Sequence, residues 1–127
     1  MNDAGRLAAD LLHDVGKYLA RTARNVGERS IDAVLADMLA RDAYETHRGR
    51  RASARFAEVA EQLEALGVRH PSLATARAAL ARIDALEPGV RSKEPAALHS
   101  LVTLAVEAEG ALRALAVSTR RVGEAER

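Results

Sequence analysis

The stretch LHSLVTLAVEAEGALRAL, residues 98–115, repeats apolar side chains at intervals of three and four residues. The repeated positions are Leu98, Leu101, Ala105, Ala108, Leu112 and Leu115, and Val122 continues the series. Such spacing brings one apolar side chain to the same face of an α-helix at every turn. The stretch therefore predicts a long amphipathic helix that buries one face in a hydrophobic core.

The same periodicity recurs along most of the chain, whereas alternating apolar and polar residues, which are typical of strands, do not persist anywhere. Further helices are predicted over about 3–25, 31–47, 52–66 and 73–83. Gly27, Gly67 and the EPGV segment at 87–90 are expected to end helices, and Ser30 and Ser92 to cap the helices that follow.

Gly49 lies within THRGRRAS, residues 46–53, and predicts a break or kink there. The alternative is one continuous helix over 31–66, because a single glycine costs a helix only about 1 kcal/mol. Amphipathic helices joined by short polar turns indicate an antiparallel bundle. We therefore expect an all-α fold of four long or five shorter helices, in a single domain over residues 1–127 with a tail that frays from about 122.

Composition excludes several classes of function. The chain of 127 residues is long enough for one core, and its net charge of +1 gives no strong field to attract nucleic acid. It contains no cysteine, which excludes thiolate catalysis and cysteine-based zinc sites. Neither a targeting segment nor an apolar run of membrane-spanning length is visible. A cytoplasmic protein that needs no cofactor or metal and no membrane is expected.

The N-terminal helix contains LLHDVGKYLARTARN, residues 11–25. On a helix, His13 lies roughly 150° from the middle of the apolar stripe. We expect His13, Lys17 and Arg24 to share an exposed face, with Val15 and Leu19 buried.

Small residues follow the row of His13 along the helix, namely Ala9, Gly16 and Ala20. Gly16 costs the helix about 1 kcal/mol relative to alanine, so its presence needs an offsetting gain. One interpretation is a close contact with another helix of the bundle or with a second copy. The other is a docking strip beside a reactive imidazole.

LLHDVGKYL, residues 11–19, resembles the helices that carry a phosphoacceptor histidine in histidine-kinase dimerisation and histidine phosphotransfer domains. It is similar to the LHDxVGQxL box of one kinase class, with one residue fewer between Asp14 and Gly16. The resemblance implies that His13 attacks a phosphoryl group. Asp14 would then hold the ring and take its proton, and Lys17 would steady the phosphoryl oxygens.

The string LLHDVGK also resembles the LLHDxGK centre of HD-type metal phosphohydrolases. That resemblance implies His13 and Asp14 as adjacent metal ligands that activate a water molecule. The family also requires an earlier histidine and a later aspartate. No histidine precedes His13, and His47, His70, His99 and Asp84 are the later candidates, outside any ligand motif.

A basic run follows the second predicted helix and contains Arg48, Arg50, Arg51 and Arg55. It is interpreted either as a solvated turn or as a patch that binds an anion or nucleic acid. If this turn folds back near Arg21 and Arg24, the His13 face becomes a basic pocket suited to phosphate or to an acidic partner.

These patterns predict a small interaction or signalling module rather than an enzyme. It would contact a protein partner or a second copy through its first helix, and His13 would act as a phosphoacceptor in the most specific version. The alternatives are a rearranged or inactive HD-type phosphohydrolase and a structural, self-assembling subunit.

Overall fold

The computed structural model describes residues 3–28, 33–46 and 49–125, and the side chains of residues 3–24, 37–46 and 49–120. All of its regular elements are helical: α1 (Asp3–Leu11), the π-helical turn η1 (Leu12–Gly16), α2 (Lys17–Glu28), α3 (Ala33–Tyr44), α4 (Ala52–Ala65), α5 (Pro71–Ala85), α6 (Glu87–Arg91) and α7 (Pro95–Ala125). The predicted all-α bundle is confirmed.

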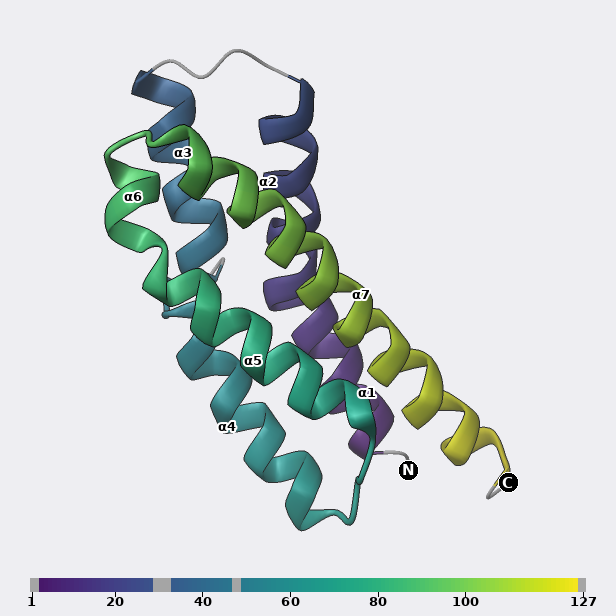
Figure 1. The fold of residues 1–127 in the computed structure, drawn as a ribbon. Helices are drawn as coiled ribbons and strands as arrows, with labels where there is room; N and C mark the ends of the chain where they lie inside the picture. The colour runs from purple at the N-terminus through teal and green to yellow at the C-terminus, as the bar shows by residue number, and fades with distance from the viewer. Residues whose placement is uncertain (1–2, 29–32, 47–48, 126–127) are drawn as a thin grey trace.

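The helices form four antiparallel columns (Figure 1). The first column is α1, η1 and α2, the second is α3 and α4, the third is α5 and α6, and α7 is the fourth. The first column packs against α7 and against the second, and α5 packs against both α4 and α7. The alternatives of four long or five shorter helices are thus resolved as four columns, and non-helical turns divide the second and the third.

The core is built mainly from leucine and alanine. Its fully buried side chains include Leu11, Leu63, Leu101 and Leu115, and alanines between them allow the columns to approach closely. The predicted stripe of α7 is confirmed from Leu98 to Leu115, because all six of its positions are buried. Val122 lies outside the described side chains.

The break at Gly49 is confirmed. Helix α3 ends at Tyr44 rather than near 47, and Thr46 closes the turn: its backbone N–H donates to the Arg50 carbonyl oxygen at 2.7 Å, and its hydroxyl oxygen accepts from the Arg50 backbone N–H at 3.2 Å. Gly49 has a φ of +75°, a conformation that other residues adopt at a cost. A continuous helix over 31–66 is therefore excluded.

The other predicted helix boundaries have mixed outcomes. The stop at Gly67 is confirmed, because α4 ends at Ala65 and Gly67 follows with a φ of +87°. The first column continues one residue past Gly27, to Glu28.

The EPGV segment does end the helix before it, because α5 stops at Ala85. It also starts α6, which was not predicted, because proline fits the first turn of a helix and Val90 is fully buried. Ser92 consequently ends α6 instead of capping α7. The expected cap at Ser30 lies outside the described residues.

The π-helical turn interrupts the first column at LHDVG. The backbone N–H of Lys17 donates to the carbonyl oxygen of Leu12, five residues earlier, instead of to that of the residue four earlier, as in an α-helix. The widened turn directs three consecutive residues inward, so that Asp14, Val15 and Gly16 are all buried. Leu11, just before this turn, is fully buried, whereas Leu12 is only partly buried.

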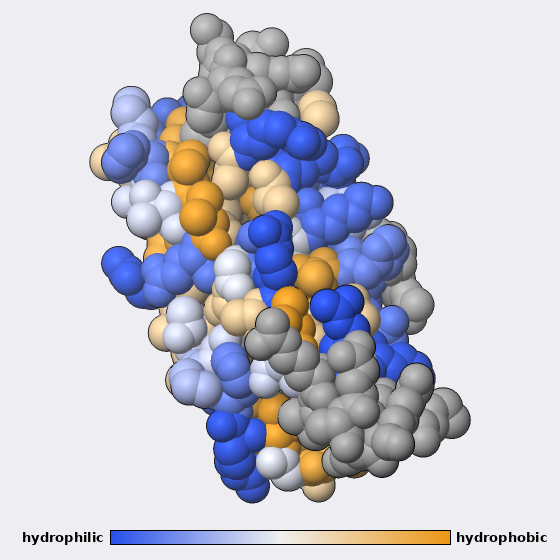
Figure 2. Space-filling model, turned by 90° about the vertical axis from the view of Figure 1, so that its right-hand side faces the viewer, coloured by the Kyte–Doolittle hydropathy of each residue, from blue (hydrophilic) through white to orange (hydrophobic). Residues whose placement is uncertain are grey.

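Figure 2 shows the side of the molecule that lies to the right in Figure 1. Apolar areas on this face are narrow strips separated by charged side chains. Among the described residues, the large apolar side chains that are exposed are Leu66, just after α4, and Val106, on α7. The coloured part of this face shows scattered apolar areas rather than one broad apolar patch.

Candidate functional site

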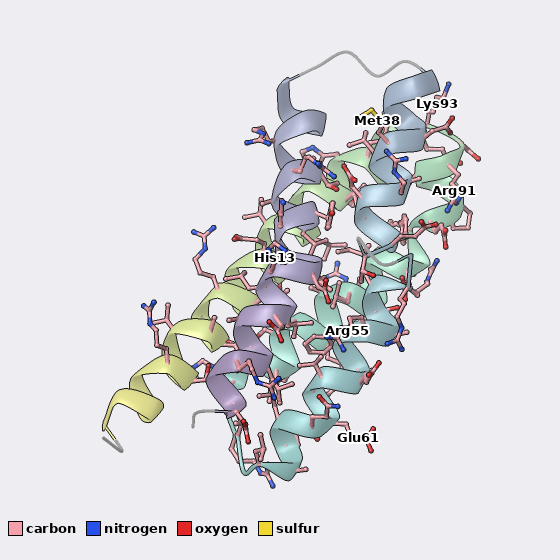
Figure 3. The ribbon with its side chains drawn as sticks, turned by 180° about the vertical axis from the view of Figure 1, so that it is seen from behind. His13, Met38, Arg55, Glu61, Arg91 and Lys93 are labelled. Atoms are coloured by element: carbon pink, nitrogen blue, oxygen red, sulfur yellow. The ribbon has the colours of Figure 1, made fainter. Side chains whose placement is uncertain are left out.

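His13 is exposed in the π-helical turn, midway along the first column (Figure 3). Lys17 and Arg24 are exposed as well, whereas Val15 and Leu19 are buried. The exposure pattern that helical phase predicted for this face is thus confirmed at all five positions. An exposed imidazole with a cation one turn further along the helix is accessible to a partner molecule.

Asp14 lies on the inner side of the same turn. Its side chain is 4% exposed, and its Oδ2 accepts a hydrogen bond from Nε of Arg55, on α4, at 3.1 Å. The side chain of Arg55 is itself only 15% exposed, and its Nη1 lies 3.5 Å from Oε1 of Glu58. The Asp14 carboxylate therefore anchors the π-helical turn to α4.

This ion pair bears on both resemblances. In each of them the Asp14 carboxylate works beside His13, as a proton acceptor or as a metal ligand, whereas here one of its oxygens is bonded to Arg55. The sequence drew attention to Arg55 only as part of a basic run. Its pairing with Asp14 was missed, because the two residues are 41 positions apart in the chain.

The small residues near His13 do not form one strip. Ala9 and Ala20 are exposed, but Gly16 is buried, so its assignment to the exposed binding row was wrong. A Cβ at Gly16 would lie 2.7 Å from Leu12 Cδ1 and 3.6 Å from Leu112 Cδ1 on α7. The missing side chain makes room for Leu12 and for a close approach of α7. This agrees with the first of the two interpretations of Gly16, a close contact with another helix of the bundle.

Arg21 is held on two sides. Its Nε and Nη2 donate to the two carboxylate oxygens of Asp42, on α3, at 3.0 and 2.9 Å, and its Cζ lies 4.7 Å from the centre of the Tyr18 ring. The Asp42 side chain is 3% exposed, whereas that of Arg21 is 39% exposed. The hydrogen bonds to Asp42 raise the pKa of Arg21 above its ordinary value. The guanidinium is thus permanently charged and fixed in place.

A surface pocket of about 330 Å³ opens beside this ion pair. Its walls include Tyr18 and Arg21 from α2, Arg41 and Asp42 from α3, and Glu45 and Gly49 from the segment between α3 and α4. The turn around Gly49 therefore does fold back to Arg21. The pocket is not basic overall, however, because two carboxylates lie in its wall beside two guanidinium groups.

The predicted basic patch is largely neutralised. Arg50 pairs with Glu58 at 2.7 Å, and Arg51 pairs with Asp84 at 3.0 Å and with Glu87 at 2.7 Å. The hydrogen bond from Arg51 lowers the pKa of Glu87, an effect that its burial opposes. Arg48 lies outside the described residues. Arg50 and Arg51 thus tie the turn to α4, α5 and α6.

The other candidate metal ligands are dispersed. His70 caps α5, where its Nδ1 accepts from the backbone N–H of Ser72 at 3.1 Å, Asp84 pairs with Arg51, and His99 is exposed on α7. His47 lies outside the described residues. Among the residues that the structure describes, no three histidine, aspartate or glutamate side chains gather as a metal-binding group would require.

Within the described residues, no helix combines the length and apolarity needed to cross a membrane. Comparison of the chain with protein-family models, with curated proteins and with solved structures gives no match.

Proposed function

We propose that the protein is a phosphotransfer-like module in which His13 accepts a phosphoryl group from a partner. The observation that carries the proposal is the exposure of His13 on a helix of a four-column bundle, with Lys17 exposed one turn later. A neutral imidazole is a good nucleophile, and an exposed one on a rigid helix can enter the active site of another protein.

The chemistry needs only one group from this chain to react. A ring nitrogen of His13 attacks the phosphorus of an acyl phosphate or of a phosphorylated partner. The bond from phosphorus to the donor's leaving group breaks, the leaving group departs with the electron pair, and the ring proton passes to solvent. Lys17 lies close enough in helical spacing to donate to the phosphoryl oxygens.

The residues around His13 orient its ring or leave room for the partner. Asp10, three positions earlier, is exposed, and its carboxylate takes over the role of holding the ring that the resemblance gave to Asp14. Asp14, paired with Arg55, holds the π-helical turn that presents His13. Ala9 and Ala20 are exposed and small, which leaves space for a partner, and Arg24 adds positive charge. A protein partner at the first column and a cytoplasmic location remain predictions.

Incubation with acetyl phosphate or phosphoramidate, followed by ³¹P NMR and mass spectrometry, tests the proposal. We expect one phosphoryl group per chain, stable in base and labile in acid. His13→Gln abolishes the label and leaves the far-UV circular dichroism unchanged, because an exposed substitution alters stability by no more than about 0.5 kcal/mol. Lys17→Ala slows labelling roughly tenfold or more, since a charge-assisted hydrogen bond contributes about 1.5–3 kcal/mol.

His99 provides the matched control. It is exposed on a helix like His13, but the residue four positions later is Thr103 rather than a lysine. His99→Gln should leave the label intact. An unlabelled wild-type protein with both donors, or a label that survives His13→Gln, would contradict the proposal.

A further inference from the structure

The pocket beside Arg21 has features that the chemistry of His13 does not use. Its rear wall is a prebuilt unit in which the buried Asp42 carboxylate holds one edge of the Arg21 guanidinium and the Tyr18 ring covers one of its faces. A guanidinium that is fixed in this way loses little conformational entropy when it binds a further acceptor. Such a unit is well suited to hold a ligand in a defined orientation.

Arg21 retains donors for that ligand. The guanidinium has five N–H groups, and the side-on pair with Asp42 engages Nε and Nη2. The described part of the chain supplies no acceptor for Nη1, and Arg21 lines the pocket. A carboxylate can therefore bind at this edge without displacing Asp42.

The charges at the pocket mouth have both signs. Arg41 and Glu45 are exposed, line the same pocket and have no side-chain ion partner among the described residues. With Arg21 and Asp42, the pocket wall carries two positive and two negative formal charges. A phosphate dianion would gain from Arg21 and Arg41 but would meet the Glu45 carboxylate, which disfavours it. A small molecule with one charge of each sign matches this arrangement better.

We propose that this pocket binds a free α-amino acid. The α-carboxylate pairs with Arg21, supported by Arg41, and the α-ammonium pairs with Glu45. The volume of about 330 Å³ accommodates a small amino acid, and its side chain projects toward the open mouth. The site is separate from the proposed phosphoacceptor and does not depend on it.

The aromatic composition supplies a direct assay. The chain has two tyrosines, one phenylalanine and no tryptophan, so the tyrosine ring signals are few in a proton NMR spectrum. Tyr18 lines the pocket, whereas Tyr44 is buried and donates its hydroxyl proton to the Ile83 carbonyl oxygen at 2.7 Å. Tyr18→Phe assigns the signals, and Tyr44 serves as an internal reference.

Titration with L-alanine should shift the Tyr18 signals in a saturable manner, with a dissociation constant on the order of 1 mM, and leave those of Tyr44 in place. N-acetylalanine and alaninamide each lack one of the two charges and should bind about tenfold more weakly or worse. Inorganic phosphate should produce no saturable shift. His13→Gln should bind alanine like the wild type, which separates this proposal from that of the phosphoacceptor.

Glu45→Gln is the decisive variant, because Glu45 is exposed and its replacement leaves the Arg21–Asp42 pair intact. It should weaken alanine binding about tenfold or more, and Glu61→Gln, an exposed change on α4, should not. Any of three results overturns the proposal: no saturable shift with alanine up to about 50 mM, equal binding of alanine and its blocked derivatives, or full binding by Glu45→Gln. Saturable shifts with phosphate alone would identify an anion site instead.

Discussion

Replacement of Arg55 by methionine tests whether the ion pair with Asp14 holds the π-helical turn in place. The substitution keeps most of the apolar stem and removes the charge that faces a carboxylate only 4% exposed. Breaking a buried ion pair by removing one member costs about 3–5 kcal/mol, and the 15% exposure of Arg55 favours the lower end of this range. We therefore expect Arg55→Met to lower the free energy of unfolding by about 3 kcal/mol at pH 7.

Asp14→Asn should cost less, about 1–2 kcal/mol, because the amide oxygen still accepts a hydrogen bond and Arg55 keeps Glu58 within 3.5 Å. In the double variant no buried carboxylate is left behind. The decrease in the free energy of unfolding of the double variant should therefore be smaller than the sum of the decreases of the two single variants, by more than about 1 kcal/mol.

Arg50→Met is the matched control. Arg50 also pairs with a glutamate, Glu58, at 2.7 Å, but its side chain is 53% exposed. Solvent screens such a pair, so its loss should cost less than about 1 kcal/mol. The comparison separates the effect of burial from that of ion pairing as such.

The assay is urea denaturation followed by circular dichroism at pH 7. Equal losses for Arg55→Met and Arg50→Met, or a loss below about 0.5 kcal/mol for Arg55→Met, would refute this reasoning.

Two further predictions concern other parts of the bundle. Gly110→Ala should raise the free energy of unfolding by about 0.5–1 kcal/mol in urea denaturation, because Gly110 is exposed within α7 and a Cβ there meets no atom within 4 Å; an unchanged or lower stability would contradict the open space at this position. Glu87→Gln should destabilise the protein above pH 4.5 but progressively less below it, because Arg51 lowers the folded-state pKa of Glu87 from its ordinary value of 4.5, and the stabilisation is lost as the pH falls through the lowered value. Urea denaturation of the wild type and of Glu87→Gln between pH 3 and pH 7 checks this. A difference in stability that stays constant over this range would count against the ion pair.

Local properties of the sequence determined the fold class and the exposure of the His13 face. Helical phase depends only on spacing along one segment, so Leu98 to Leu115 could be assigned to the core, and His13 and Lys17 to solvent, without knowledge of any other helix. The break at Gly49 was also predictable, because a glycine in a polar run both weakens a helix and permits a positive φ.

Tertiary structure alone decided the pairing of charges and the register of the first column. Asp14 and Arg55 are 41 positions apart, and Arg21 and Asp42 are 21 apart, so periodicity within one helix contains no information about either pair. The π-helical turn buries Gly16 against Leu112 of α7. In a regular helix, Gly16 would have stayed on the row of His13. Burial of a charge is stabilising only when another element brings its partner, and that condition is set by how the columns pack.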